Sequence, residues 1–137
     1  MQNYIIVTPR FSDFNMQGIL KASVHLDLAC ESQLAQMAPR YNLPLPSFSA
    51  KGLRWHLADF KISFPKVVKS LNPLRVEADV VAIEDNAMII EFSFFDETRE
   101  QKYAFGKIRF ELVDTKDQPI AISGDIKQSL TQFGRMT

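Results

Sequence analysis

Cysteine and histidine are almost missing from this sequence. Its 137 residues contain one cysteine, Cys30, and two histidines, His25 and His56. A single cysteine cannot close an internal disulfide, and these three residues do not form a zinc-ligand set. The sequence therefore predicts no internal disulfide, no metal and no cofactor.

Net charge and long apolar runs are also missing. The 16 basic residues balance 16 acidic ones, so no overall field attracts the chain to nucleic acid or to an anionic membrane. The apolar run Tyr4–Val7 is too short for a signal peptide or a membrane span, and Pro9 and Arg10 soon follow it. We expect a soluble cytoplasmic protein.

Apolar residues are plentiful, at 46% of the chain against 23% charged. Together with the length, this composition predicts one globular domain over residues 1–137 with enough apolar side chains for a core.

One segment has two possible periodicities. Residues Ser23–Leu28 alternate as in a strand, whereas an apolar set recurs at helical spacing: Ala22, Leu26, Cys30, Leu34 and Met37. The strong helix formers in Ala29–Met37 favour the main helix, with Ser23 as N-cap and Pro39 beyond its end.

Strand signals dominate the rest of the chain. A first strand is predicted within Asn3–Arg10, and a loop containing Pro44, Pro46, Ser47 and Ser49 precedes four longer runs. Those runs are Leu53–Phe64, Leu74–Ile83, Ala87–Phe95 and Lys102–Val113. Residues Glu84–Asn86 predict a hairpin, and Gly106 predicts a bulge or a close backbone approach. We predict an α+β fold in which an antiparallel sheet wraps around one helix.

The candidate site is the polar loop Phe11–Leu20. Asp13, Asn15 and Gly18 have the spacing of a loop that places a side chain and a free backbone N–H at the start of a helix. Such a position can hold a developing negative charge.

Three stretches together resemble the hotdog-fold acyl-CoA thioesterases of the 4-hydroxybenzoyl-CoA thioesterase type. The loop Ser12–Leu20 is similar to the family's Asp-x-Asp-x-x-Gly stretch, and Ala58–Pro65 to its strand ending in proline. The third stretch, Gly106–Asp114 followed by Gln118–Ile120 and a closing helix from about Asp125, is similar to the family's C-terminal part. Taken together in this order, the three stretches span nearly the whole chain.

The resemblance implies a five- to six-stranded antiparallel sheet around one long central helix. It also implies a homodimer or homotetramer, with an acyl-CoA or acyl-carrier-protein thioester bound in a tunnel at the dimer interface. Long strand edges need such a partner on physical grounds as well. By position, Gly18 is the oxyanion donor, Asn15 occupies the place of the catalytic Asp, and Asp13 matches the first Asp of the loop.

Asn15 changes the expected chemistry, because an amide is neither a base nor a good nucleophile near pH 7. It can donate a hydrogen bond to a thioester carbonyl or orient a water molecule, and some hotdog thioesterases that act on polyketide chains carry Asn here. The nearest titratable groups are Asp13, His25 and Glu31. Asp13 is also explained as an Asx-turn residue, and Asn15 as a turn residue.

The remaining site residues are predicted to contact substrate. Phe60 and Phe64 line the acyl tunnel, and His25 lies close to the loop in sequence. Arg40, Lys61, Lys66 and Lys69 form either a solvated face or contacts to CoA phosphates.

Three functions follow from these features. The first is hydrolysis of an acyl-CoA or acyl-carrier-protein thioester. The second is a non-hydrolytic hotdog protein for acyl-thioester binding or protein interaction, which Asn15 favours. The third is a dehydratase or hydratase, which would pair His25 with Glu31 or Asp27.

Overall fold

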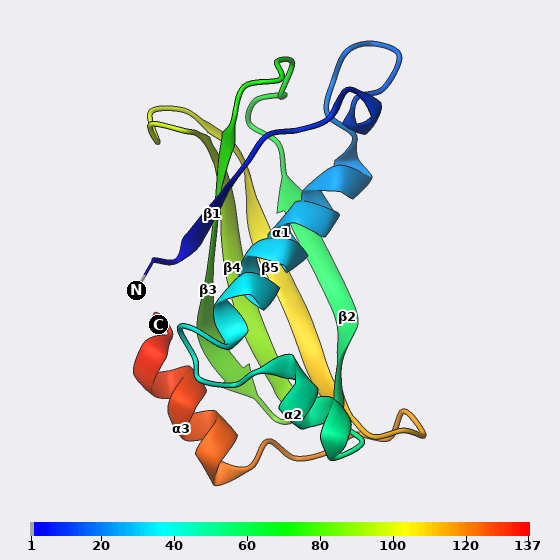
Figure 1. Cartoon of the computed structure of the whole chain (residues 1–137), viewed down its shortest axis with the longest axis vertical. Helices are drawn as coiled ribbons and strands as arrows, with labels where there is room; N and C mark the ends of the chain where they lie inside the picture. The colour runs from blue at the N-terminus through cyan, green and yellow to red at the C-terminus, as the bar shows by residue number, and fades with distance from the viewer. Residues whose placement is uncertain (1) are drawn as a thin grey trace.

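A five-stranded antiparallel sheet curves around one long helix (Figure 1). The computed structural model describes residues 2–137. The strands are β1 (Tyr4–Val7), β2 (Arg54–Ser63), β3 (Leu74–Glu84), β4 (Ala87–Asp96) and β5 (Lys102–Val113). The helices are η1 (Phe11–Asp13), α1 (Ala22–Met37), α2 (Leu45–Ala50) and α3 (Gly124–Phe133). The predicted α+β class and the four long strands are confirmed.

The strand order is β1-β3-β4-β5-β2, so β1 and β2 form the two edges. Alternation of side chains sends Val76, Ala78 and Val80 of β3 toward α1, and their partners on β4 are Phe94, Phe92 and Ile90. All six side chains are buried. The core therefore lies between the concave face of the sheet and α1.

Helix α1 buries a different face from the predicted one. Its buried residues are His25, Leu28, Ala29, Ser32, Gln33, Gln36 and Met37, whereas Leu34 is 42% exposed. Two of its buried polar side chains bond to β3: the Ser32 hydroxyl donates to Val76 O (2.7 Å) and the Gln36 amide to Ala78 O (3.2 Å). The prediction that the apolar stripe through Leu34 faces the core is therefore wrong.

Three further predictions about local structure need correction. Lys21, not Ser23, is the N-cap of α1, and Ser23 lies inside the first turn. The proline-containing segment predicted as loop holds the short helix α2, where proline at N1 or N2 is well tolerated. The first strand ends at Val7, before Pro9.

Gly106 confirms the predicted close approach of backbone. It pairs with Phe92 on one side and Ile62 on the other. A Cβ at this position would overlap the carbonyl oxygen of Lys61 and lie 2.9 Å from Cζ of Phe92.

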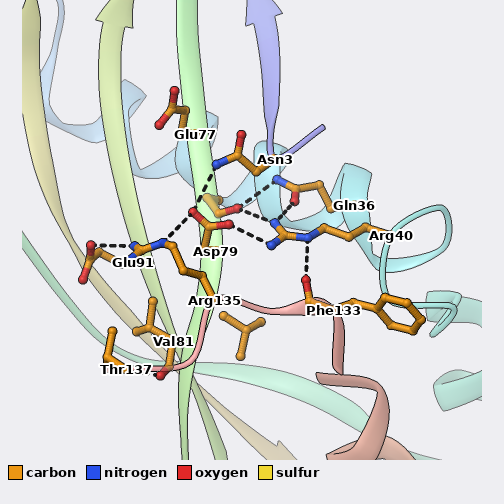
Figure 2. A network of polar contacts seen from close by, with 12 residues as sticks. Asn3, Gln36, Arg40, Glu77, Asp79, Val81, Glu91, Phe133, Arg135 and Thr137 are labelled. Carbon is orange, nitrogen blue, oxygen red and sulfur yellow. Dashed lines mark hydrogen bonds and ion pairs between the residues drawn. The ribbon is translucent and has the colours of Figure 1, made fainter. Parts of the chain in front are cut away.

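The C-terminal residues cover the part of β3 that β1 leaves open (Figure 2). The amides of Arg135 and Thr137 donate to Val80 O (2.8 Å) and Val81 O (3.1 Å). Beside them, the buried Asp79 carboxylate accepts from Arg40 at 2.8 Å and from Arg135 at 3.4 Å. Arg135 and Thr137 therefore extend the hydrogen bonding of β3 beyond the end of β1.

Candidate functional site

The loop before α1 is a tight hairpin. Phe14 bridges to Leu20 in antiparallel fashion, and the Asn15 amide donates to Ile19 O at 2.8 Å. The Leu20 amide then donates to Val68 O at 2.9 Å, which ties the hairpin to the loop between β2 and β3. The hairpin is therefore a defined element rather than a loose connection.

The side chain of Asn15 is fixed by this hairpin. Its Oδ1 accepts from the amides of Gln17 (2.9 Å) and Ile19 (3.0 Å). Two N–H donors can face only the oxygen of the side-chain amide, so the orientation is determined. Nδ2 has no acceptor among residues 2–137, and it is the group that Asn15 can offer to a substrate.

Gly18 is essential to the same hairpin through its backbone. Its φ is 75°, in the left-handed region that favours glycine, and a Cβ would meet no atom within 4 Å. Its N–H, predicted to be a free oxyanion donor, donates instead to Asn15 O at 3.0 Å. In this structure the amide of Gly18 is engaged in the turn.

Free backbone donors lie at the start of α1. The Lys21 side chain makes no cap, and the amides of Ala22 and Ser23 have no acceptor among residues 2–137. The N-terminal amides of a helix carry partial positive charge and bind anions. Sequence reasoning missed these two donors because it took Ser23 as the cap. A lysine at position 21, which cannot accept a hydrogen bond, was the available signal.

Asp13 shapes the loop. Its carboxylate accepts from the Arg10 amide at 2.7 Å, and its backbone carbonyl accepts from the Lys21 amide at 3.0 Å. These contacts close the turn of η1 and join it to the start of α1. The carboxylate thus reaches back to the amide three residues earlier, as in a capping box, so the prediction of an Asx-turn at Asp13 is wrong although Asp13 does shape the loop.

A hollow of about 460 Å³ opens beside the hairpin, within the usual size range of small-molecule sites. It is lined by Phe11, Phe14, Asn15, Met16, Gly18, Lys69 and Leu71. The lining contains aromatic and aliphatic walls, one amide and one ammonium group. It contains neither a carboxylate nor an imidazole.

His25 lies in the first turn of α1, and only 2% of it is exposed. Its Nδ1 lies 2.9 Å from Lys21 O, which makes Nδ1 the protonated nitrogen of a neutral ring. Nε2 is buried and has no hydrogen-bond partner among the described residues 2–137. Burial lowers the pKa of His25, and the hydrogen bond to Lys21 O only partly opposes this.

The predicted substrate-contacting residues form one aromatic cluster. The ring of His25 meets those of Phe64 and Phe94, each with centroids 4.9 Å apart. Phe94 contacts Phe92 edge-on, and Phe92 stacks on Phe60 at 5.5 Å. The structure thus brings His25, Phe64 and Phe60 into one cluster, but none of the three lines the hollow.

The alternative catalytic pairs are not brought together. Asp27 and Glu31 are exposed on α1, whereas His25 is buried with its Nδ1 on Lys21 O. Burial and the nearby Asp27 raise the pKa of the half-buried Cys30, which favours the unreactive thiol. No cluster of three metal-ligating side chains exists within residues 2–137.

No helix in the described part of the chain is both long and apolar enough to cross a membrane. A cytoplasmic location stays a prediction.

Comparison with solved structures identifies the architecture. The DHNA-CoA thioesterase of Staphylococcus aureus superposes with a TM-score of 0.86 at 10% identity, over 95% of this chain and 89% of that chain. YbaW, a probable thioesterase of Escherichia coli, gives 0.83 at 13% identity, over 97% and 99%. The dynemicin thioesterase gives 0.82 at 11% identity, over 100% and 99%.

No protein-family model matches the sequence, and no curated protein is significantly similar to it. At these identities the structural matches establish the fold and not the activity. The sheet order, the central helix and these superpositions show that the chain has the hotdog fold.

Proposed function

We propose that this protein hydrolyses an acyl thioester at the hairpin Phe14–Leu20. The observation that carries the proposal is the fixed side chain of Asn15, whose Oδ1 is held by two backbone amides while Nδ2 is left to donate. The hotdog fold shared with CoA thioesterases gives independent support.

The chemistry follows from the donors. Attack on a thioester places negative charge on the carbonyl oxygen, which needs preorganised hydrogen-bond donors. Asn15 Nδ2, in the lining of the hollow, is such a donor, and the open amides of Ala22 and Ser23 at the start of α1 would add to it. One donor of this kind contributes on the order of 10²–10³ in rate. Gly18 acts by holding the hairpin, and Asp13 by joining it to α1.

The site still lacks a group that can accept the proton of the attacking water. The lining of the hollow has no carboxylate and no imidazole, so we infer that a second protomer completes the site. Strand β2 offers the surface for this, because it is ten residues long and its outer edge is unpaired in the sheet. Pairing of two β2 edges would give a homodimer, and further association would give a homotetramer.

The substrate is an acyl group on CoA or on a carrier protein. Phe60, Phe64 and His25 would contact the acyl chain, since their rings form a continuous apolar cluster on the concave side of the sheet. In this proposal the His25 ring packs within the cluster that holds the acyl chain and does not act as a base, because its Nε2 is buried.

A second candidate function is binding of an acyl thioester without hydrolysis. The absence of a base from the lining favours it. In that case Asn15 holds the carbonyl of the ligand, and the complex is stable.

The test is release of free thiol from a panel of short, long and aromatic acyl-CoAs, with Asn15→Ala and Asn15→Asp beside the parent. Asp at position 15 keeps an oxygen for the amides of Gln17 and Ile19 but replaces the Nδ2 donor by a carboxylate. Hydrolysis by the parent, reduced about 10²-fold or more in Asn15→Ala, would support the proposal.

Two other results would contradict hydrolysis by the native protein. Turnover only in Asn15→Asp would identify a binding protein that lacks its base. No turnover in any of the three, together with no acyl-CoA binding, would leave an interaction module. Light scattering on the parent tests the dimer, for which we expect at least twice the mass of one chain.

A further inference from the structure

Large exposed apolar side chains gather at one end of the molecule. Ten such side chains are exposed within residues 2–137, and five of them lie on the segments 8–21 and 64–73: Phe11, Met16, Phe64, Val67 and Leu71. The bond from Leu20 N to Val68 O holds the two segments together. Clustered exposed apolar side chains mark interaction sites.

The same two segments are basic although the whole chain is neutral. They contain four cationic side chains, Arg10, Lys21, Lys66 and Lys69, and one acidic side chain, Asp13. The Asp13 carboxylate is already held by Arg10. The acidic turn after β4 borders segment 64–73, because Asp96 and Glu97 line one hollow with Ser70 and Asn72. The Asp96 carboxylate already accepts from the Thr98 hydroxyl and the Gln101 amide, and this turn also carries the basic residue Arg99.

We propose that segments 8–21 and 64–73 form a docking surface for an acidic carrier protein, which delivers the acyl thioester on a flexible arm. This proposal rests on the proposed function and specifies its substrate. We call the two segments the basic apolar surface. It surrounds the hollow beside Asn15, so a docked carrier would have only a short way to pass its arm to the reacting centre.

The shape of the surface favours a protein over the nucleotide of CoA. Met16 is fully exposed and Phe11 is 87% exposed, so both project from the surface. A nucleotide is held by groups that converge in a cleft, whereas projecting aromatic and methionine side chains insert into the groove of a partner protein.

Charge argues against a second copy of this chain as the occupant. A two-fold axis through the surface would place four cationic side chains against the same four. An acidic partner matches this charge and would be steered toward the site, with faster association at low salt.

The test compares one acyl group on two carriers. Octanoyl-CoA and the octanoylated acyl carrier protein of bacterial fatty-acid synthesis are given to the parent, to Lys66→Glu and to Val67→Ser. Neither residue lines the hollow, and Lys66 Nζ donates to Gln101 Oε1 at 3.2 Å. The octanoyl-CoA arm therefore also tests the alternative in which Lys66 contacts the phosphates of CoA. Lys127→Glu, on the exposed face of α3 at the other end of the molecule, is the control of equal charge change (Figure 1).

We expect kcat/KM for the carrier-protein substrate to fall about tenfold in Lys66→Glu, with a smaller fall in Val67→Ser. Activity on octanoyl-CoA should change less than about twofold, and Lys127→Glu should match the parent on both substrates. Equal losses on both substrates would overturn the proposal. So would a lower molecular mass of Lys66→Glu in light scattering, because the surface would then be a self-interface.

A calorimetric titration with the unacylated carrier protein separates this inference from the proposed function. If the parent hydrolyses neither substrate, hydrolysis fails; binding of the carrier that Lys66→Glu weakens would still support the docking surface. Absence of binding by the parent in this titration would overturn it.

Discussion

The region of the hairpin and the region around Asp79, in the middle of β3, differ in how their polar groups are paired. Around Asp79, buried charges are paired and the carbonyls of β3 accept from side chains or from the C-terminal residues (Figure 2). Around Asn15, an amide nitrogen and the first two amides of α1 have no partner among residues 2–137, and apolar side chains project into solvent. The first arrangement serves stability. The second has the unsatisfied donors and exposed surface that a binding site needs.

The largest expected loss of stability comes from breaking the ion pairs of Asp79. Asp79→Ala leaves the mostly buried Arg40 guanidinium without its carboxylate. Loss of one partner of a buried pair costs about 3–5 kcal/mol of unfolding free energy. Urea denaturation measures it. Asp117→Asn, which removes an exposed charge partner of Arg54 and tolerates the left-handed φ of 60° at this position, should cost less than about 1 kcal/mol. Equal effects of the two variants would show that the Asp79 network is no more important than a surface pair.

Gly106→Ala tests the close packing in the middle of the sheet, where Gly106 lies in one row with Ala78, Phe92 and Ile62. The added Cβ would overlap Lys61 O, which is backbone and cannot move aside cheaply. We expect a loss of about 1–3 kcal/mol, the usual range for overpacking, in thermal or urea unfolding. Gly124→Ala, where a Cβ meets nothing within 4 Å, is the control and should change stability by less than about 1 kcal/mol. A neutral Gly106→Ala would contradict the register of β5 with β2.

A pH titration tests the buried imidazole near the hairpin. The pKa of His25 is lowered in the folded protein, so the unfolded chain binds a proton first as the pH falls below about 6.5. The stabilisation from neutral His25 is therefore complete above that pH and is lost progressively below it. The slope is at most about 1.4 kcal/mol per pH unit.

The same unfolding experiment on His25→Phe provides the comparison. The difference in stability between parent and variant should shrink on acidification in this window. A constant difference across pH would mean that the imidazole is accessible to protons in the fold.

Gly18→Ala should have the smallest effect on stability. Alanine at a φ of 75° costs about 1–2 kcal/mol, and no clash adds to this because the site is open. Gly18→Asn, which tolerates left-handed geometry better, should lose less in the same urea titration. If both variants were neutral, the hairpin would have relaxed, and Asn15 would no longer be held as described.

The fold was largely predictable because its strands alternate clearly. Val76, Ala78 and Val80 on β3 show the two-residue period, and the hairpin at Asp85 needs a residue that accepts a positive φ. The buried face of α1 was not predictable. Apolar residues recur at helical spacing through Leu34, but the helix turns its polar Ser32 and Gln36 inward toward carbonyls of β3.

For the candidate site, the sequence located the loop but not the state of its donors. Asn15 and Gly18 lie in the hairpin and Asp13 lies in η1 just before it, all three within the predicted loop between β1 and α1, and their roles in a site stay predictions. Which amide is free depended on the turn: Gly18 donates inward, while the amides of Ala22 and Ser23 stay open. The spacing of these residues in the sequence cannot predict which amide is free, because the same residues are compatible with either hydrogen-bond pattern.

By itself the sequence determined the α+β class, the strand segments, the main helix and the loop that carries the candidate site, since local propensity and period act over a few residues. Only the tertiary structure decided the face of α1 that is buried, the amides left free at the start of α1 and the pairing of Asp79 with Arg40 and Arg135. Those outcomes depend on partners far apart in the chain, and their energies exist only when the chain is folded.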